Sequence, residues 1–582
     1  MSQNQVISLP NAQKRPIICE YAGGHFKLSD KGITFVGTDK DGNQLPPRWI
    51  CSALSVVAKT RDAKSGEWGR LLEWKDDDGV IHQWAMPLAL LQGDSSDVRR
   101  ELARLGLAIS PNKLARDLLT SYLQVFPIEA RARCVDRLGW YEDVFVTANG
   151  SIGTNEEKVV FQNNNAIEPA LSCSGSVDEW RNSIGRLASG NSRLVFAIAT
   201  AFAPSLAKLA GEDSGGFHFR GTSSSGKSTA LKVAASVWGN PKSYCRLWRS
   251  TSNGLEGLAA LHNDGLLILD ELSQIDPREA GEAAYLLANG QGKTRASKTG
   301  AAKKSASWSL VFLSAGEESL TALMAKAGQR VNAGQEIRLA DIEADAGTGM
   351  GLFEKTHEQI SPAAMAITLK ELTDKLYGAV GLSWLEHVVA NRQTLIPVIN
   401  NMINQFIEKV SSKDITGQVI RVARRFALVA AAGELATQFG LTRWQRGESF
   451  QAAQQCFKSW QENFGTDGNR EDRAIMAQVR AFFESHGASR FDNVRDPNNG
   501  RIVNRAGFYR TDDKGFRLFM VLPEVYKNEL CKGYEPRMAT RVLINAGWLM
   551  PASDGKSSHK PRINGVGTPR LYFFSEKIWG EE

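Results

Sequence analysis

A run of eight residues combines glycines, serines and a lysine in an order that can hold a phosphate. It reads Gly221-Thr-Ser-Ser-Ser-Gly226-Lys227-Ser228. Glycines let the backbone curl so that its N–H groups face a β-phosphate, and the N-terminus of a following helix adds a favourable dipole. Lys227 can then reach the β- and γ-phosphates, and the Ser228 hydroxyl can ligate Mg²⁺. We therefore expect ATP and Mg²⁺ as ligands. The expected nucleotide contacts are Gly221, Thr222, Ser223, Ser224, Ser225, Gly226, Lys227, Ser228 and Thr229.

Such a loop needs a strand before it and a helix after it, and the flanking sequence supplies both. Residues 217–220 alternate apolar and polar side chains, as a short strand does. Residues 228–237 place apolar side chains at helical spacing, and Gly239-Asn240-Pro241 ends that helix. This order favours a phosphate site over a simple glycine-rich turn.

Two carboxylates follow a second apolar strand. Residues 266–269 are Leu-Leu-Ile-Leu, typical of a strand buried on both faces of a parallel sheet, and Asp270 and Glu271 come next. Ligands bind at the carboxyl ends of such strands. Asp270 would hold Mg²⁺ through water, and Glu271 would polarise the water that attacks the γ-phosphate. Alone, the pair fits a solvated acidic turn equally well, but beside the phosphate loop it predicts hydrolysis.

A third apolar strand, residues 310–313, ends in Ser314. A polar residue at that position could sense the γ-phosphate beside the catalytic water. An ordinary serine at a strand end is the alternative interpretation.

A basic stretch separates the second and third strands. From Ala283 to Gly316 there is no acidic residue, and a turn at Thr299-Gly300 with flanking alternation predicts a β-hairpin with a basic tip. Sequence-independent binding to nucleic acid comes mainly from Lys and Arg that neutralise phosphates. We expect a DNA contact here, with a solvated charged loop as the alternative. The residues concerned are Lys293, Arg295, Lys298, Lys303 and Lys304.

Length and composition indicate a multidomain globular protein. The chain has 582 residues, of which 42% are hydrophobic and 23% charged, with a formal net charge of +7. Its seven cysteines lie far apart without a Cys-x-x-Cys pair, which indicates reduced thiols rather than disulfides or a zinc ribbon. The apolar run 194–210 is interrupted by Pro204, Ser205 and Lys208, and residues 1–16 lack a signal-peptide core. We expect a cytoplasmic protein without membrane contact.

The order of elements predicts an α/β protein in five parts. They are a β-rich module (1–110), a mixed α/β connector (111–185), an ATPase core with the basic hairpin (186–345), a helical lid (346–465) and a winged-helix domain (466–582). In the last part, residues 537–546 would form a recognition helix. Residues 555–570 would form a wing without acids, with DNA contacts from Lys556, Lys560 and Arg562. Protein contacts are the alternative use of a winged helix.

Several segments together resemble a phage- and genomic-island-borne family catalogued as domain of unknown function 927. They are residues 248–256 (WRSTSNGLE), 269–272 (LDEL), 285–293 (YLLANGQGK), 313–317 (LSAGE) and 333–338 (AGQEIR). The family is regarded as helicase-like, similar to superfamily 3 and AAA+ replicative motors, and often accompanies primases.

The resemblance implies a homo-hexamer or other ring in which a neighbouring subunit completes each ATP site. An arginine in trans would stabilise charge on the γ-phosphate. Arg338, just before the final core strand, best matches that role, and Arg330 is the alternative. In the lid, Arg421, Arg424 or Arg425 could approach the nucleotide or make ordinary pairs. We find no primase-like acidic cluster in residues 1–185, so a separate primase would be a partner.

These expectations lead to two hypotheses for function. The first is an ATP-dependent DNA helicase or ring translocase that replicates a mobile genetic element and acts on single-stranded or forked DNA. The second is a nucleotide-switched, origin-binding initiator or loader without processive unwinding. A phosphate-loop kinase is disfavoured because Glu271 beside Asp270 suits water activation.

Overall fold

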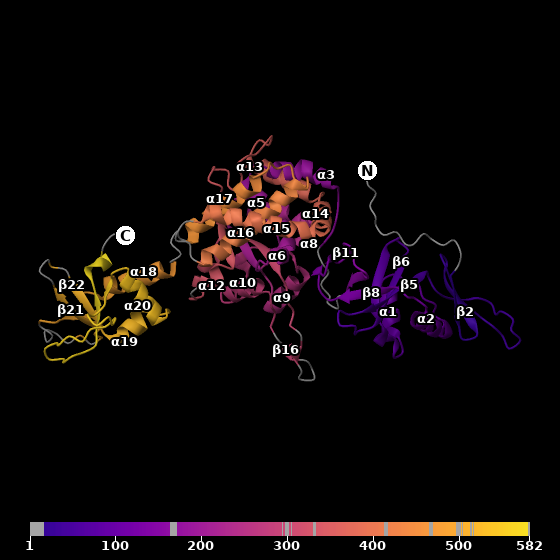
Figure 1. The fold of residues 1–582 in the computed structure, drawn as a ribbon, viewed down its shortest axis with the longest axis horizontal. Coiled ribbons are helices and arrows are strands. Elements are labelled where there is room, and N and C mark those ends of the chain that lie inside the picture. Colours follow the sequence, from indigo (N-terminus) through magenta and orange to yellow (C-terminus); the bar gives the residue numbers. More distant parts are fainter. Residues whose placement is uncertain are drawn as a thin grey trace.

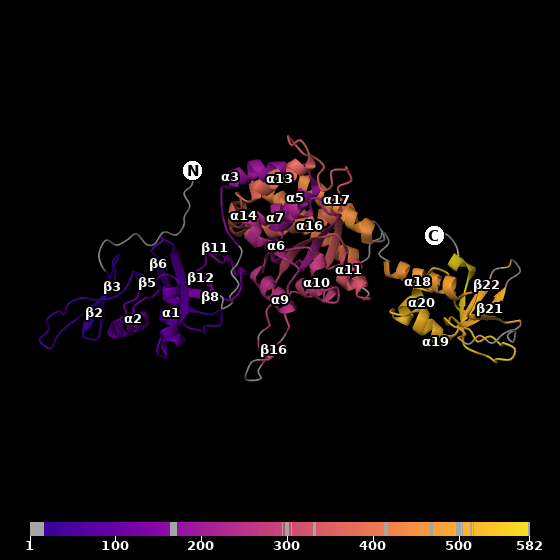
Figure 2. The same cartoon turned by 180° about the vertical axis from the view of Figure 1, so that it is seen from behind.

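The computed structural model places the chain in three bodies that lie in a row (Figure 1). Figure 2 shows the same arrangement from behind, with the N-terminal and C-terminal bodies on opposite sides of a larger central body. The phosphate loop and the acid pair both belong to the central body. The structure describes residues 17–162, 171–293, 295–296, 302–303, 305–329, 333–411, 417–464, 470–495, 502, 504–511, 515 and 517–579.

The N-terminal body consists of two sheets and two helices. The first sheet is antiparallel, in the order β1 (Ile17–Tyr21), β2 (Gly24–Ser29), β3 (Gly32–Gly37) and β4 (Arg48–Cys51). The second has the order β12-β8-β5-β6-β7, with β5 (Leu54–Arg61), β6 (Gly69–Lys75), β7 (Ile81–Pro87), β8 (Arg131–Val135) and β12 (Lys158–Phe161). The helices are α1 (Ser96–Arg104) and α2 (Lys113–Val125).

The boundary predicted at residue 110 does not separate two cores. Tyr122 of α2 is buried against Phe26 of β2, and its hydroxyl donates a hydrogen bond to the carbonyl of Leu54. Strand β8 pairs in parallel with β5. The β-rich module and much of the predicted connector are therefore one structural unit, because long-range strand pairing joins segments that local patterns keep apart.

A five-stranded parallel sheet forms the middle of the central body. Its order is β14-β15-β18-β13-β19, with β13 (Gly215–Arg220), β14 (Arg246–Leu247), β15 (Gly265–Asp270), β18 (Leu310–Gly316) and β19 (Leu339–Glu343). The phosphate loop follows β13 and the acid pair ends β15. Since β18 lies between these two strands, and all strands run in parallel, both motifs lie at the same edge of the sheet.

Helices cover both faces of this sheet. Phe217, Ile268 and Leu313 face a core shared with α5 and α16, whereas Leu267 and Phe312 face α9, α10 and α11. The helices from the predicted lid thus pack directly on the sheet and share its core. The helices up to β19 are α3 (Val177–Trp180), α4 (Arg186–Ala188), α5 (Ser192–Phe202), α6 (Pro204–Ala210), α7 (Lys227–Ala235), α8 (Pro241–Tyr244), α9 (Ser252–Leu261), α10 (Ala280–Asn289), α11 (Leu320–Lys326) and α12 (Ala333–Glu336). Those after it are α13 (Pro362–Thr373), α14 (Ala379–Ala390), α15 (Arg392–Val410), α16 (Gly417–Gln438) and α17 (Glu448–Phe464).

A small sheet of order β11-β10-β9 joins the N-terminal body to the central body. Its strands are β9 (Gly139–Tyr141), β10 (Val144–Thr147) and β11 (Gly150–Ile152). The backbone N–H of Trp140 donates to Asp264 Oδ2 at 2.9 Å. Arg137 donates to Asn263 Oδ1 at 2.9 Å, and the same oxygen accepts the N–H of Ser309 at 2.8 Å. We call these contacts of Arg137, Trp140, Asn263 and Asp264 the clasp.

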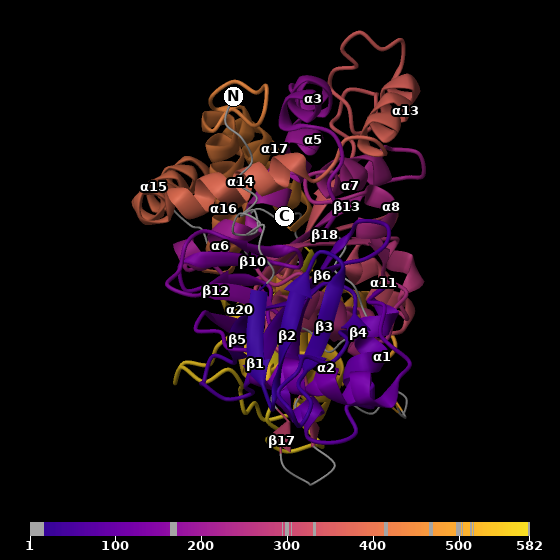
Figure 3. The same ribbon diagram turned by 90° about the vertical axis from the view of Figure 1, so that its right-hand side faces the viewer.

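The basic hairpin projects beyond the rest of the central body (Figure 3). It directly precedes β18, whose amino end lies beside that of β15. Its described strands are β16 (Arg295–Ala296) and β17 (Ala302–Lys303), which pair antiparallel. The hairpin is thus confirmed between α10 and β18. It leaves the sheet at the edge opposite the phosphate loop, because β18 begins directly after the hairpin and the phosphate loop lies at the carboxyl ends of the strands.

The C-terminal body contains a five-stranded sheet and three helices. The strands have the order β20-β21-β22-β24-β23, with β20 (Phe491–Asn493), β21 (Gly507–Thr511), β22 (Arg517–Val521), β23 (Leu549–Met550) and β24 (Tyr572–Phe574). The helices are α18 (Arg470–His486), α19 (Pro523–Val525), which continues as a π-helical turn to Leu530, and α20 (Pro536–Asn545). The helix predicted over residues 537–546 is present as α20, whereas β20, β21 and β22 were not predicted.

Among the described residues, no single helix is long and apolar enough to cross a membrane. Helices α5 and α6, bent at 62° to each other, are together long and apolar enough for a broken span, by length and composition alone. Every residue of α5 is buried in the protein core.

Candidate nucleotide-binding and hydrolysis site

The phosphate loop has the strand and helix that its sequence predicted. Strand β13 ends at Arg220, and α7 begins at Lys227 with Gly226 as its N-cap. The Lys227 side chain folds back over the loop, where Nζ donates to the carbonyls of Gly221 at 2.7 Å and Thr222 at 2.6 Å. Because these carbonyls satisfy the buried ammonium without any acid, a phosphate could replace them as a stronger partner.

Both the backbone conformation at position 226 and the side chain packed against it favour glycine. Its φ of +94° lies in the left-handed region, and a Cβ there would lie 3.0 Å from Leu352 Cβ. The segment around Leu352 closes over the loop, since its N–H donates to the Ser225 carbonyl at 2.9 Å. Ser225 Oγ is buried and has no hydrogen-bond partner among the described residues. The loop therefore has the backbone curl and a spare polar group that a phosphate ligand would use.

The acid pair lies at the same sheet edge, with β18 between its strand and that of the loop. Asp270 is the last residue of β15, and its Oδ1 accepts the backbone N–H of Glu271 at 3.0 Å. Glu271 has a φ of +56°, and both acids are half-buried. The backbone N–H of Trp248 donates to the Asp270 carbonyl at 3.1 Å, which fixes the end of β15.

The residues present fit a magnesium nucleotide. Ser228 at the start of α7 and Asp270 at the end of β15 supply one hydroxyl and one carboxylate. In the described residues no group of three or more His, Cys, Asp or Glu side chains could hold a metal. Mg²⁺ needs no such group, because one or two carboxylates, water and substrate phosphates usually complete its octahedron.

Ser314 is fully buried within a hydrogen-bonded group rather than exposed at the strand end. Its Oγ lies 2.9 Å from Trp248 Nε1 and 2.9 Å from His218 Nδ1. His218 Nε2 lies 2.9 Å from the carbonyl of Glu318. The sequence did not indicate a role for His218 or Trp248. The alternation in residues 217–220 did place His218 on the strand that precedes the phosphate loop.

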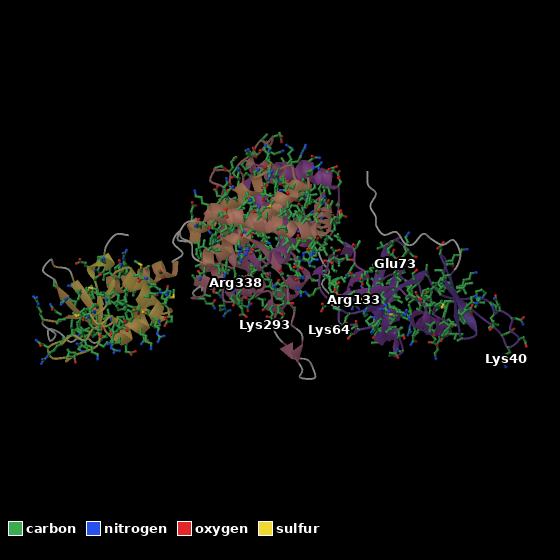
Figure 4. The ribbon with its side chains drawn as sticks, in the orientation of Figure 1. Lys40, Lys64, Glu73, Arg133, Lys293 and Arg338 are labelled. Atoms are coloured by element: carbon green, nitrogen blue, oxygen red, sulfur yellow. The ribbon has the colours of Figure 1, made fainter. Side chains whose placement is uncertain are left out.

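Arg338 lies at the amino end of β19, remote from the phosphate loop of its own chain. Its carbonyl accepts the N–H of Gly216 at 2.8 Å, at the start of β13. The guanidinium stacks on Tyr285 at 4.2 Å from the ring centre and donates to the Gly334 carbonyl. Figure 4 shows Arg338 and Lys293 on the same side of the central body. Arg330 lies outside the described residues.

The other lid arginines also lie away from the loop. Arg424 pairs with Glu212, just before β13, and Arg425 is buried against the Ile337 carbonyl at 3.2 Å. Burial lowers the pKa of Arg425 to about 10. Arg421 is exposed. Arg424 and Arg425 thus make the ordinary pairs that were the alternative expectation.

The candidate DNA contacts are only partly described. Lys293 pairs with Glu282 at 2.8 Å, and its N–H donates to Glu256 Oε1 at 3.1 Å, which anchors the base of the hairpin to α10 and α9. Arg295 and Lys303 lie on β16 and β17, whereas Lys298 and Lys304 lie outside the described residues. In the C-terminal body, Lys560 and Arg562 are exposed. Lys556 is also exposed but pairs with Asp554 at 2.7 Å.

A cavity of about 370 Å³ lies beside the phosphate loop, with no residue of the loop or the acid pair in its lining. Arg220, which directly precedes the loop, lies in its wall and is held by Asp341 at 2.9 Å and Glu343 at 2.8 Å. Trp460 and Phe464 of α17 close the other side.

Comparison with known proteins agrees with these observations. Residues 26–307 match the family model described as "Domain of unknown function (DUF927)". No curated protein matches the chain. The resemblance indicated by the sequence motifs is thereby confirmed over this part of the chain.

The chain is also similar to solved structures. One, described as "SCCmec type IV Cch - active helicase", is similar over 97% of this chain and 100% of its own, with a TM-score of 0.69 and 18% identity. At that identity the likeness establishes a shared fold. The other, "The A form apo structure of NrS-1 C terminal region-CTR(305-718)", covers 67% of this chain and 91% of its own at 10% identity. Its TM-score of 0.23 carries no argument.

Proposed function

We propose that this protein is an ATP-dependent DNA helicase or ring translocase that acts in replication of a mobile genetic element. The observation that carries the proposal is the meeting of the phosphate loop and the acid pair at the carboxyl edge of one parallel sheet. Two comparisons support it: the DUF927 match, and a fold shared with a structure described as an active helicase from an SCCmec element.

The roles of the residues follow from their positions. The N–H groups of the loop and Lys227 would bind the β- and γ-phosphates, and Ser228 and Asp270 would hold Mg²⁺. When bound, Mg²⁺ would neutralise charge on the phosphates. Glu271 would accept a proton from the attacking water, since a carboxylate beside the metal ligand can reach that water. Transfer of the γ-phosphoryl group to this water yields ADP and phosphate.

The hairpin supplies the proposed link between hydrolysis and DNA. It emerges at the amino ends of β15 and β18, whose carboxyl ends lie beside the phosphate site. The two sites are separated by the length of β15, roughly 16–20 Å for six extended residues. In a ring, a basic hairpin at that edge would face the central channel and grip successive backbone phosphates.

We further propose that the active form is a homo-hexamer or another ring. Arg338 lies at the sheet edge opposite its own phosphate loop, so it could reach a γ-phosphate only from a neighbouring subunit. An arginine supplied in this way stabilises charge in the transition state. Priming of DNA synthesis would fall to a separate primase.

Three assays of the purified protein test the proposal: ATP hydrolysis, its stimulation by single-stranded DNA, and separation of a forked duplex with ATP and Mg²⁺. The Lys227→Ala variant is the matched negative control, because it removes the ammonium that contacts the phosphates. We expect DNA-stimulated hydrolysis and strand separation by the wild type alone. Hydrolysis that no DNA affects would contradict a motor function.

The C-terminal body favours a second candidate, an origin-binding initiator or loader. Strand β24 pairs with both β22 and β23, and the segment between β23 and β24 carries the exposed Lys560 and Arg562. We propose that this body is a winged helix, which would read DNA with its recognition helix. DNA-stimulated hydrolysis without strand separation, together with protection of one defined sequence, would favour this candidate.

A further inference from the structure

Side-chain hydrogen bonds join Ser314 of β18 to His218 of β13 and to Trp248, which follows β14. Ser314 lies opposite His218 of β13 and Leu269 of β15, so it occupies the strand between the phosphate loop and the acid pair. Ser314 and His218 are completely buried, and so is Trp248, which follows β14. A polar group in such surroundings must be satisfied by its neighbours.

The chemistry of the partners fixes the direction of each hydrogen bond. An indole N–H can only donate, so Trp248 Nε1 donates to Ser314 Oγ. A carbonyl can only accept, so His218 Nε2 carries the hydrogen that faces Glu318. Burial lowers the pKa of His218 to about 4, which leaves the ring neutral near pH 7. His218 Nδ1 is then a hydrogen-bond acceptor, and the Ser314 hydroxyl donates to it.

This arrangement leaves Ser314 without a proton to offer a phosphate. The hydroxyl has one hydrogen, which goes to His218, and the remaining lone pair can only accept. A γ-phosphate presents acceptor oxygens and requires donors. Contact with the phosphate would therefore demand that the buried group be rearranged.

The same group contacts both catalytic motifs through the backbone. Trp248 donates its N–H to the carbonyl of Asp270 at 3.1 Å, beside the acid pair. Gly316, two residues after Ser314, accepts the N–H of Gly221 at 3.2 Å, at the start of the phosphate loop. A Cβ on Gly316 would lie 3.1 Å from His218 Cε1 and 3.2 Å from Leu272 Cβ.

We propose that His218 and Trp248 are positioning residues that hold Ser314 as a buried connector between the phosphate loop and the acid pair. Ser314 then acts on catalysis through geometry and not as a direct sensor of the γ-phosphate. This inference rests on the proposed function, because it concerns the alignment of a hydrolytic site. Misalignment affects the chemical step more than ground-state binding, since the attacking water must be placed precisely against the phosphate.

The decisive variant is Trp248→Phe, which keeps an aromatic ring and removes the donor to Ser314. We expect kcat for ATP to fall at least about 10-fold while the Kd for nucleotide changes less than about 3-fold. Trp308→Phe is the matched control. Trp308 is buried in the same core and donates to the Leu287 carbonyl at 3.0 Å, away from the site. The Trp308→Phe variant should lose about as much thermal stability as Trp248→Phe but keep the wild-type kcat.

A double-mutant cycle with Ser314→Ala distinguishes positioning from direct contact. If the residues act as a unit, adding Trp248→Phe to Ser314→Ala lowers kcat no further. His218→Asn, whose amide oxygen can accept from Ser314, should retain more activity than His218→Leu. A slow Ser314→Ala variant beside a fully active Trp248→Phe variant would overturn the inference and restore the sensor role. A wild type without hydrolysis would instead overturn the proposed function itself.

Discussion

Glu271 combines an unusual backbone conformation with the proposed role of general base. A φ of +56° for a residue other than glycine costs about 1–3 kcal/mol, and such strain persists where neighbouring contacts impose it. Here the Asp270 carboxylate accepts the Glu271 N–H, and β14 fixes the end of the strand. The turn thereby presents two adjacent carboxylates at the sheet edge.

Replacement of Glu271 tests the assignment of the base. In Glu271→Gln the side chain keeps its size but cannot accept the proton, so hydrolysis should slow by about 10²-fold or more. Nucleotide affinity should stay at the wild-type value, measured by titration with a fluorescent ATP analogue. Glu279→Gln, at an exposed acid before α10, is the control. Wild-type turnover in Glu271→Gln would show that another group activates the water.

Two buried histidines predict a dependence of stability on pH. Burial lowers the pKa of His218 and of His262 from 6.5 to about 4 in the folded state. Between pH 6.5 and pH 4 the unfolded chain binds more protons than the folded chain. The contribution of each histidine to the free energy of unfolding is therefore fully present above about pH 6.5 and is lost as the pH falls toward 4. At roughly 1.4 kcal/mol per pH unit, each histidine accounts for about 2 kcal/mol between pH 7 and 5.

Calorimetry of the central transition at pH 7 and pH 5 measures this loss. The His262→Gln variant should show a smaller decrease in its unfolding temperature between the two pH values than the wild type. His262 is the better choice for substitution because it is not part of the Ser314 group. Equal decreases in variant and wild type would exclude His262 as a source of the dependence.

At the level of elements, the hairpin is the feature that separates a motor from a nucleotide-binding scaffold. Each phosphate contact changes the slope of log affinity against log salt by about −0.7 for single strands. Replacement of Lys298, Lys303 and Lys304 by alanine should therefore flatten that slope and abolish stimulation of hydrolysis by DNA. Basal hydrolysis should remain, because the hairpin leaves the sheet edge opposite the phosphate loop.

The matched control for the hairpin replaces exposed lysines elsewhere. Lys40 lies at the far end of the N-terminal body, away from the hairpin, and Lys64 lies on the same body (Figure 4). Their removal lowers the net charge without touching the proposed channel. If the hairpin variant and the control lose DNA affinity equally, the contact is general electrostatic attraction. Unchanged unwinding in the hairpin variant would leave the C-terminal body as the main DNA contact.

At the scale of the whole molecule, Arg338 predicts complementation between subunits. Arg338→Ala should bind ATP but lose hydrolysis, because the transition-state charge loses its partner from the neighbouring subunit. Mixing it with Lys227→Ala should restore part of the turnover, since an intact loop can then meet an intact arginine. Turnover is measured over a series of mixing ratios. Inactivity at every ratio would place Arg338 outside the interface.

The clasp joins the N-terminal body to the central body, so a substitution that breaks it should loosen their attachment. Gly139 has a φ of +88°, and a Cβ there would overlap Asp264 and Asn263. Gly139→Ala should therefore break the hydrogen bond from Trp140 to Asp264 and destabilise the protein by about 2 kcal/mol or more. Limited proteolysis should then cut between the bodies faster than in the wild type.

Gly150→Ala separates steric overlap from backbone strain. Gly150 also has a positive φ, of +142°, but a Cβ there would meet nothing within 4 Å. If Gly150→Ala is as sensitive to proteolysis as Gly139→Ala, backbone strain and not the clasp explains the effect.

The chemistry that the sequence by itself predicted resides in short segments of the chain. The loop 221–228, the strand–acid pattern 266–271 and the basic hairpin each depend on neighbours within a few residues, so their local conformation follows from side-chain type and spacing. The helices of the C-terminal body were predictable for the same reason. These motifs, with the resemblance they carry, indicated the family before any fold was known.

Tertiary structure decided which of these segments meet. The sequence could not show that β8 pairs with β5, that the hairpin and the phosphate loop lie at opposite sheet edges, or that the Ser314 hydroxyl donates a hydrogen bond to His218. The residues of the Ser314 group come from β13, β18 and the segment after β14, which are far apart in the chain. Strand order brings them together, and burial then forces their polar atoms to satisfy one another.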